Sequence, residues 1–237
     1  MYSYETRVRF SKTDERGLLS PGALFDEFQD CAEYESADRG VGARYLMEHS
    51  QGWVVAYYEA VIDRMPHISD VLTVSTIPHR LHGYLGERNF LIKDTKGEVI
   101  VAADSMWVYM DTRNVKMMRI PDEVIEAYKP DMGERYDISP RGRRINMPED
   151  MEYRTDFQIR KCDQDYNGHV NNTVYLDLME EFIPPDETLC RARVSYKAPI
   201  LYGDSIKAYT KRVGESLFIS LANGEGEEAV AAEMVFK

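Results

Sequence analysis

The 237-residue sequence predicts an α+β fold in which the chain builds the same kind of unit twice. Each half begins with a strand, passes through a polar turn into one apolar helix, and then alternates between apolar and polar residues like a series of antiparallel strands. The helix and one face of the sheet each need an apolar partner, and a sheet that curls around the helix satisfies both. We therefore expect two such units, joined as an internal pseudo-dimer.

The first unit is expected to cover residues 1–129. Alternation predicts a strand over 5–10, and a polar turn follows over 11–19. Ser20 and Pro21 supply an N-cap and a proline at the first helical position. Apolar residues then recur at helical spacing, namely Leu24, Phe25, Phe28, Cys31 and Ala32. Strands are predicted over 53–64, 71–78, 85–94 and 99–111.

The second unit, residues 151–237, repeats this plan. A strand is predicted over 153–160, and the proline pair at 184–185 should end the helix that follows. The apolar stripe of that helix consists of Val174, Tyr175, Leu178, Met179 and Phe182. Later strands are predicted over 189–197, 205–213, 217–222 and 229–236. The sequence GEVIVAA at 97–103 matches GEEAVAA at 226–232, which indicates an internal repeat.

Residues 130–150, which are rich in proline and glycine, are predicted to link the two units. A curled antiparallel sheet around a central helix is the shape of a hotdog domain. The fold class expected from the sequence is therefore α+β, with two tandem hotdog domains.

Charge and composition argue against several classes of protein. The formal net charge of −12 argues against partners that are nucleic acids or anionic membranes. No run approaches the roughly 18 apolar residues of a membrane span, and the N-terminal residues lack the pattern of a secretory signal. Cys31, Cys162 and Cys190 are too few for a disulfide framework and match no metal-site spacing. We therefore expect a cytoplasmic protein without a metal.

The turn before the second helix carries a dense group of polar residues, in the sequence KCDQDYNGHVNNTVY at 161–175. It begins like an EF-hand calcium loop, with oxygen ligands at Asp163, Asp165 and Asn167. The twelfth position of such a loop should be a bidentate glutamate, and here it is Val174. The sequence therefore disfavours a calcium site.

Two interpretations of this turn remain open. Asp, Asn and Gly are common in ordinary turns, and Asn171 or Asn172 would be a normal N-cap for the helix. An ordinary turn does not explain why Asp165, Asn167 and His169 alternate at a spacing of two. In an extended segment, that spacing points three side chains to one side.

The second interpretation is chemical. Histidine is the side chain most readily tuned to exchange a proton near neutral pH, and His169 would stand just before a helix N-terminus that favours negative charge. A carbonyl held there could be attacked by water, with Asn167 orienting the water or the imidazole and Asp165 holding one of them. The matching turn of the first unit, residues 14–21, has neither asparagine nor histidine. The chemistry is therefore expected in the second unit alone.

The sequence DQDYNGHVNNTVYLDLMEEFIP at 163–184 resembles the Asp-x-Asn-x-His-Val-Asn-Asn-x-x-Tyr signature of the acyl-ACP thioesterase family. Residues 97–124 resemble the first-domain strand and the following segment of that family, and the match covers nearly the whole chain. The resemblance implies two hotdog domains and hydrolysis of the thioester between a fatty acyl chain and acyl carrier protein (ACP), without a metal or an organic cofactor. It also implies that Asp165, Asn167 and His169 are the catalytic residues.

Two departures from the family pattern limit this inference. Leu178 stands where the family usually has tryptophan, a change that we expect to affect packing. The Glu-Cys pair that plant members carry on a later strand is absent, since Ala198, Pro199 and Ile200 follow Lys197. An acyl-CoA thioesterase and a non-catalytic hotdog protein that binds acyl chains or a carrier protein therefore stay open as alternatives, as do a monomer and a homodimer.

Basic residues are the candidates for contact with an acidic carrier protein, although a charged strand face is often merely solvated. They form two sets, with Arg191, Arg193 and Lys197 on one strand face and Arg141, Arg143 and Arg144 in the linker. His79 is expected at the surface. Asp104, within an apolar run, should either face outward or be buried beside a partner.

Overall fold

The computed structural model describes residues 1–165 and 168–237, whose strands form one antiparallel sheet. The strands of the first half are β1 (Tyr2–Arg7), β2 (Gln51–Ile62), β3 (Val71–His82), β4 (Leu85–Lys93), β5 (Val99–Asp111) and β6 (Lys116–Met117). Those of the second half are β7 (Glu152–Gln158), β8 (Leu189–Tyr196), β9 (Ser205–Val213), β10 (Ser216–Ala222) and β11 (Glu228–Phe236). The order is β1-β3-β4-β5-β2-β8-β11-β10-β9-β7, with β6 beside β5, so the halves meet where β2 pairs with β8.

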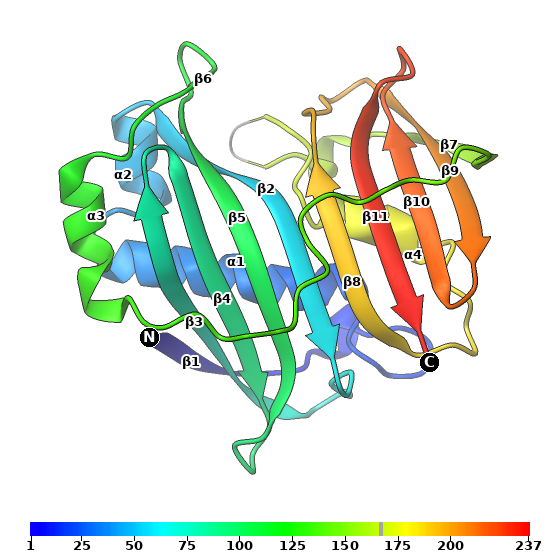
Figure 1. The fold of residues 1–237 in the computed structure, drawn as a ribbon, viewed down its shortest axis with the longest axis horizontal. Helices are drawn as coiled ribbons and strands as arrows, with labels where there is room; N and C mark the ends of the chain where they lie inside the picture. Colours follow the sequence, from blue (N-terminus) through cyan, green and yellow to red (C-terminus); the bar gives the residue numbers. More distant parts are fainter. Residues whose placement is uncertain (166–167) are drawn as a thin grey trace.

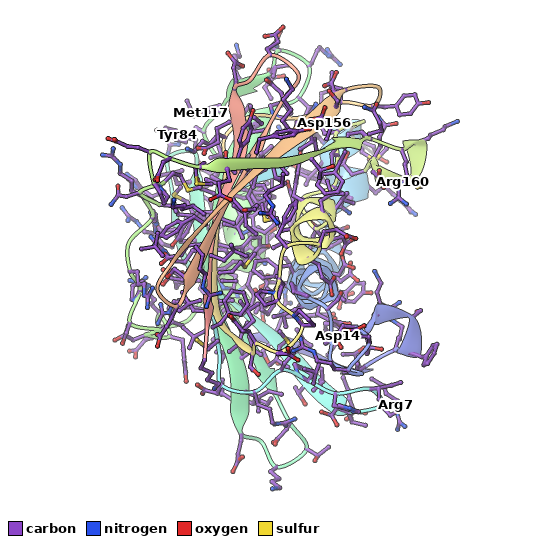
Figure 2. All side chains as sticks on the ribbon, turned by 90° about the vertical axis from the view of Figure 1, so that its right-hand side faces the viewer. Arg7, Asp14, Tyr84, Met117, Asp156 and Arg160 are labelled. Carbon is purple, nitrogen blue, oxygen red and sulfur yellow. The ribbon has the colours of Figure 1, made fainter. Side chains whose placement is uncertain are left out.

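Two helices, α1 (Pro21–Asp38) and α4 (Val174–Glu180), lie on one face of this sheet (Figure 1). Seen from the side, Asp14 and Arg160, which lie shortly before the two helices in the chain, project on the same side of the sheet as the helices (Figure 2). Each half thus wraps its part of the sheet around one helix, as the alternation of the sequence predicts.

The start of α1 follows the predicted signals. Pro21 occupies the first turn, and Ser20 Oγ accepts the backbone N–H of the third helical residue at 3.2 Å. The apolar face of the helix is buried, and the ring of Phe28 stacks on Phe90 with centroids 5.0 Å apart. Burial of this aromatic layer against the sheet supplies the hydrophobic stabilisation that fixes α1 in place.

The start of α4 differs from the prediction. Its N-cap is Thr173 rather than Asn171 or Asn172. The side chain of Asn171 instead holds the cap residue, because its Oδ1 accepts the N–H of Thr173 at 3.3 Å. The helix ends at Glu180, before the proline pair, whereas the predicted stripe extended to Phe182.

Two short helices and three 3₁₀ turns were not predicted. The helices are α2 (Ala43–Glu48) and α3 (Asp122–Tyr128), and the 3₁₀ turns are η1 (Phe10–Lys12), η2 (Lys129–Asp131) and η3 (Lys161–Asp163). The two helices pack in a buried cluster of Val41, Leu46, Tyr109, Ile120, Val124 and Tyr128. With six and seven residues, α2 and α3 are too short to show a helical period in the sequence.

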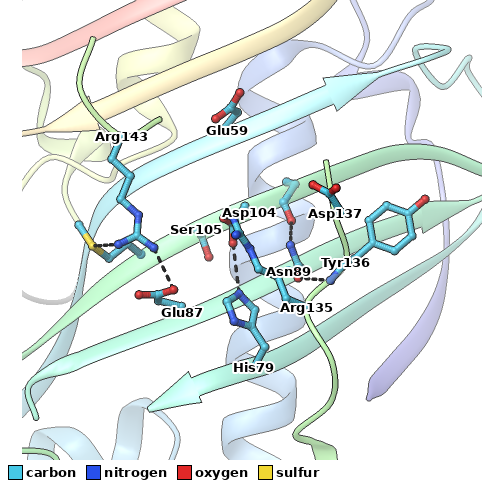
Figure 3. Close-up of polar contacts among 12 residues, drawn as sticks. Glu59, His79, Glu87, Asn89, Asp104, Ser105, Arg135, Tyr136, Asp137 and Arg143 are labelled. Carbon is cyan, nitrogen blue, oxygen red and sulfur yellow. Dashed lines mark hydrogen bonds and ion pairs between the residues drawn. The ribbon is translucent and has the colours of Figure 1, made fainter. Parts of the chain in front are cut away.

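The segment 130–150, which we call the strap, crosses the sheet face opposite the helices (Figure 1). Ile138 is buried there against Ile77 and Leu91. Polar contacts join the strap to the sheet as well, including the backbone N–H of Tyr136 on Asn89 Oδ1 at 2.8 Å (Figure 3). The strap therefore covers a sheet face that would otherwise expose its polar side chains.

The expected surface position of His79 is wrong. Its side chain is 5% exposed, with Nε2 3.3 Å from Asp104 Oδ1, and Arg135 Nη2 lies 2.5 Å from the other oxygen of that carboxylate (Figure 3). Burial alone would raise the pKa of Asp104, but the hydrogen bonds from His79 and Arg135 outweigh burial and lower it. Asp104 is therefore a buried anion with two partners, one of them from the strap.

The strand arginines are also not available for a docking surface. Arg193 Nη1 lies 2.5 Å from Glu233 Oε2, and both side chains are buried. Arg191 pairs with Glu59, whose side chain is fully buried. The pair of Arg191 and Glu59 joins β8 to β2 across the halves, whereas Arg193 and Glu233 both lie in the second half. The prediction that the strand set could meet an acidic partner is therefore wrong for these two arginines.

Candidate active site

The turn that carries the predicted site residues is closed by its own aspartate. The backbone N–H of Asp165 donates to the carbonyl oxygen of His169 at 2.8 Å, and the N–H of His169 donates to Asp165 Oδ1 at 3.2 Å. Gly168 lies between them at φ +77°, a conformation that glycine adopts without strain. Asn167, the third predicted residue, lies outside the described residues.

The first half contains the same turn. The N–H of Asp14 donates to the carbonyl oxygen of Leu18 at 2.8 Å, and the N–H of Leu18 donates to Asp14 Oδ1 at 2.9 Å. A shift of 151 residues relates Asp14 to Asp165 and places Leu18 where the second half has His169. Because the first turn closes without a histidine, the turn does not need His169 for its shape.

The turn lies at the edge of a large cavity. Asp165, Asn171 and Asn172 line this cavity, whose volume is about 390 Å³. His169 is an exposed residue, pairs through its backbone with Leu201, and is not among the described residues that line the cavity. The structure therefore brings Asp165 to the cavity wall, whereas His169 is exposed and does not line the cavity.

Most of the cavity belongs to the first half. Its apolar walls are formed by Ala32, Ala43, Leu46, Trp53, Leu81 and Trp107. These side chains come from α1, α2 and the strands β2, β3 and β5, so the cavity lies between the first helix and its own sheet. A predominantly apolar cavity with a few polar groups is the usual form of a site for a small apolar ligand.

The cavity lining also includes a group of polar side chains. Arg88, which is 7% exposed, donates to Glu35 Oε2 at 2.8 Å, and its guanidinium lies 5.3 Å from the centroid of the Tyr128 ring. The hydroxyls of Tyr128 and Ser36 are 2.7 Å apart. Burial would lower the pKa of Arg88, but the charge of Glu35 and smaller contributions from other neighbouring groups together outweigh burial and raise it, so Arg88 remains a cation.

Sequence reasoning did not identify the individual side chains of α1 that contribute to the site. Gln29 and Glu33 line the cavity, as does Ser36. Gln29 Nε2 donates to Asn171 Oδ1 at 3.4 Å, which connects the helix of the first half to the turn of the second. The spacing of these three residues, four and then three positions, places them on one helix face, and this was the signal available in the sequence.

The equivalent space beside the first turn is almost closed. A cavity of about 30 Å³ remains there, lined by Leu18, Met65 and Glu180 among others. Arg16 seals it from outside, since it pairs with Asp14 at 2.8 Å and donates to the carbonyl oxygen of Pro185 at 2.9 Å. The two turns thus share their backbone geometry, and a large cavity accompanies the one that carries His169.

Glu180 in this closed space gives a pH-dependent prediction. Burial, helped by Asp177, raises the pKa of Glu180 from 4.5 to about 6. Because the folded state holds the proton of Glu180 more tightly than the unfolded state, the folded state loses stability as the pH rises from 4.5 to about 6. The loss is complete above that range. Glu180→Gln should therefore raise the melting temperature at pH 8 by about 2–4 °C, after a discount for partial exposure, and should have little effect at pH 4. Glu181→Gln, on the exposed side of the chain, is the control, and an equal gain in both variants would contradict the assignment.

Asp165 can be tested against its counterpart. Asp165→Asn keeps an oxygen acceptor for the N–H of His169 but removes the charge, so we expect the turn to persist. The kcat for thioester hydrolysis, the activity that the family resemblance implies, should fall roughly 10- to 100-fold, which corresponds to the free energy of a charged hydrogen bond. Asp14→Asn makes the same change in the first turn and should leave kcat near that of the wild type. Steady-state kinetics of both variants check the prediction, and equal losses would show that the aspartate serves the turn alone.

Within residues 1–165 and 168–237, no group of three His, Cys, Asp or Glu side chains is arranged to hold a metal ion. In the same residues, no helix is long and apolar enough to cross a membrane.

Comparison with known proteins places this geometry in a family. The family model of the acyl-ACP thioesterase N-terminal domain matches residues 1–128, and that of the C-terminal domain matches residues 147–237. The chain is 31% identical over 156 residues to the chloroplastic acyl-[acyl-carrier-protein] hydrolase FATB2 of Cuphea viscosissima, which covers 61% of this chain and 37% of that relative. It is 28% identical over 202 residues to the chloroplastic oleoyl-acyl carrier protein thioesterase of Coriandrum sativum, covering 76% of this chain and 53% of the relative. The chain thus spans about a third to a half of the curated relatives that it matches.

Solved structures confirm the fold. The 12:0-ACP thioesterase from Umbellularia californica superposes with a TM-score of 0.86 at 20% identity, over 100% of this chain and 96% of the other. An acyl-ACP thioesterase from Bacteroides thetaiotaomicron gives a TM-score of 0.84 at 20% identity, over 99% and 97% of the two chains. The predicted α+β architecture of two hotdog units is confirmed by these likenesses. Because the two family models together match all of the chain except residues 129–146, the chain belongs to the acyl-ACP thioesterase family.

Proposed function

We propose that the protein hydrolyses the thioester of fatty acyl-ACP and releases the free fatty acid. The observation that carries the proposal is the cavity of about 390 Å³, which begins at Asp165 and Asn171 and continues between apolar side chains of the first half. Such a space suits an acyl chain whose thioester lies at the turn. The names of the matched relatives describe the same activity.

In the proposed mechanism, His169 accepts a proton from water as the water oxygen bonds to the thioester carbon. Collapse of the oxyanion then breaks the C–S bond, and the imidazolium returns the proton to the leaving thiolate. Asp165 holds the turn that carries His169, and Asn167 orients the attacking water. The exposure of His169 suits this role, because the phosphopantetheine arm of a carrier protein arrives from solvent and would lie between the histidine and the cavity.

In this proposal, the two halves have different roles. The domain of residues 1–129 holds the acyl chain, the linker of residues 130–150 ties the halves together, and the domain of residues 151–237 carries the catalytic turn. The distribution of cavity residues supports the division, since the apolar walls come from the first half and Asp165 from the second.

A second candidate is an acyl-binding protein without catalysis. The position of His169 favours it, because this residue lies outside the set that lines the cavity and the Glu-Cys pair of plant members is absent. An acyl-CoA thioesterase is the third possibility within the same fold.

One assay separates these candidates. The protein is mixed with acyl-ACP and, separately, with acyl-CoA of the same chain, and free thiol is measured over time. Faster thiol release from acyl-ACP is the expected result. Faster release from acyl-CoA would assign the other carrier, whereas tight acyl binding with an intact thioester would contradict hydrolysis and favour the binding protein.

The cavity gives a prediction about chain length. Ala32, on the α1 face that lines the cavity, is replaced by leucine to shorten the space. Because a misfit of one or a few methylene groups is worth about 1–3 kcal/mol, we expect kcat/KM to fall roughly 10- to 200-fold for the longest accepted chain and much less for short chains. Ala37→Leu, at an exposed position of the same helix, should leave the profile unchanged. Identical profiles for the wild type and Ala32→Leu would place the acyl chain elsewhere.

A further inference from the structure

The side chain of Gln29 joins the two halves of the molecule at the edge of the cavity. It extends from α1 of the first half, and its Nε2 donates to Asn171 Oδ1 at 3.4 Å across 142 residues of sequence. Gln29 and Asn171 both line the cavity, together with Asp165. No local sequence signal connects these residues, because the contact exists only once the halves have packed.

Asn171 is the residue through which this contact can act. Its backbone N–H donates to the carbonyl oxygen of Asp163 at 2.9 Å, and its own carbonyl oxygen accepts the N–H of Val174 at 3.0 Å. Its Oδ1 also accepts the N–H of Thr173 at 3.3 Å. Asn171 thus ties the end of the turn to the start of α4, and a partner that holds its side chain also holds the turn relative to the cavity.

The counterpart position in the repeat shows what is particular to Gln29. The shift of 151 residues that relates the turns places Glu180 of α4 where α1 has Gln29, and Asn171 where the first half has Ser20. Ser20 is an ordinary N-cap, and Glu180 lines the cavity of about 30 Å³ that is nearly closed. An ionised carboxylate accepts hydrogen bonds but has none to donate, whereas the carboxamide of Gln29 can donate to Asn171. The bridging amide therefore occurs beside the large cavity and not beside the small one.

We infer that Gln29 is a positioning residue for thioester hydrolysis, an inference that rests on the proposed function. It fixes Asn171, and through Asn171 the turn of Asp165 and His169, at the distance from the cavity that the reaction requires. The active site is then composite: the second half supplies the reacting groups, and the helix of the first half sets their position. Small displacements of reacting groups have large effects on rate, so the loss of one weak contact should show in kcat.

The test uses Gln29→Met, which keeps the length of the side chain and removes both amide atoms, and Gln29→Glu, which keeps the shape but has no N–H to donate. Each variant should lower kcat about five- to tenfold with KM within twofold of the wild type, and each should melt near the wild-type temperature. Glu180→Met, the same kind of change at the counterpart position, should keep the wild-type kcat. Wild-type kcat in Gln29→Met, or a loss confined to KM, would overturn the inference.

Two further measurements separate this inference from the proposed function. The double variant Gln29→Met/Asn171→Ala should be no slower than Asn171→Ala alone, because the two residues act through one contact, and additive losses would count against the inference. The side-chain amide resonance of Asn171, measured by NMR, should move in Gln29→Met and stay in place in Glu180→Met. This resonance does not depend on turnover, so an inactive wild type with a shifted resonance would refute the hydrolase while leaving the contact established. An unmoved resonance would refute the contact itself.

Discussion

His169→Ala is expected to lower kcat for acyl-ACP hydrolysis by about 10²- to 10⁴-fold, the usual contribution of a general acid–base residue. The turn that carries His169 should survive the change, because the first half closes the same turn with Leu18 in that place. His169 is exposed, so the free energy of unfolding should change by no more than about 0.5 kcal/mol. The measurement is steady-state thiol release at saturating acyl-ACP, accompanied by a thermal melt.

Two further variants test whether proton transfer by His169 is the cause of the loss. His169→Gln keeps a polar side chain that can form hydrogen bonds but cannot carry a proton at neutral pH, so it should be nearly as slow as His169→Ala if proton transfer is the role. His49→Ala is the control. It removes another exposed histidine, which stacks on Tyr45 and is distant in sequence from His169, and it should keep the wild-type rate. If His169→Ala retained full activity, the proposed mechanism would be lost, and Asp165 would become the remaining candidate base.

The strands could be predicted because their signals are local. The strand expected over 99–111 is observed as β5 (Val99–Asp111), since an apolar run follows a turn of Asp94 and Gly97 in which the N–H of Gly97 donates to the carbonyl oxygen of Asp94. The start of α1 was equally local, because Ser20 and the following proline act within a single turn. The repeat of the whole plan in the second half then led to the two-unit architecture.

The polar face of the sheet could not be predicted, because its partners are distant in sequence. Alternation assigns a charged residue such as Glu59 to solvent, and for Asp104 the sequence left both an outward position and a buried pair open, because no partner is close in the chain. The strap brings the partners: Arg135 reaches Asp104, and the backbone N–H of Arg141 reaches Glu59, 82 residues away. His79 was misplaced for the same reason.

In the candidate site, too, features formed by neighbouring residues could be predicted, and features formed by distant residues could not. The turn with Asp165 and Gly168 could be identified from its sequence, since its hydrogen bonds span four residues. The role of Gln29 could not, although its spacing with Glu33 and Ser36 places the three on one helix face. Polar residues on an amphipathic helix are normally solvated, and the partner Asn171 lies in the other half. The cavity itself is formed by side chains from separate elements, so its size is a property of packing that periodicity does not encode.

The join between the halves should depend strongly on Glu59. This carboxylate is fully buried on β2, accepts a charged hydrogen bond from Arg191 of β8, and accepts the backbone N–H of Arg141 in the strap at 3.0 Å. Glu59→Ala would leave Arg191 without its anion and the strap N–H without its acceptor. Loss of one partner of a buried ion pair costs about 3–5 kcal/mol, which for a chain of this size corresponds to roughly 6–20 °C in melting temperature.

Controls distinguish burial from charge in this experiment. Glu126→Ala removes an anion whose ion pair with Lys129 is exposed, with 62% of the glutamate side chain accessible, and should cost less than about 1 kcal/mol. Glu59→Ala/Arg191→Met should recover part of the loss, because neither charge is then left buried alone. A melting temperature unchanged in Glu59→Ala would show that the ion pair adds nothing to the join.

The same variant tests whether the halves unfold as one body. Both tryptophans, Trp53 and Trp107, belong to the first half, so their fluorescence reports on that half while far-ultraviolet circular dichroism reports on both. Glu59 contacts a strand of each half and the strap, and the sheet is continuous across β2 and β8. We therefore expect the two signals to shift together in Glu59→Ala. A shift of fluorescence alone would mean that the second half is stable without the first, and the turn with Asp165 and His169 would then keep its shape without the helix that faces it.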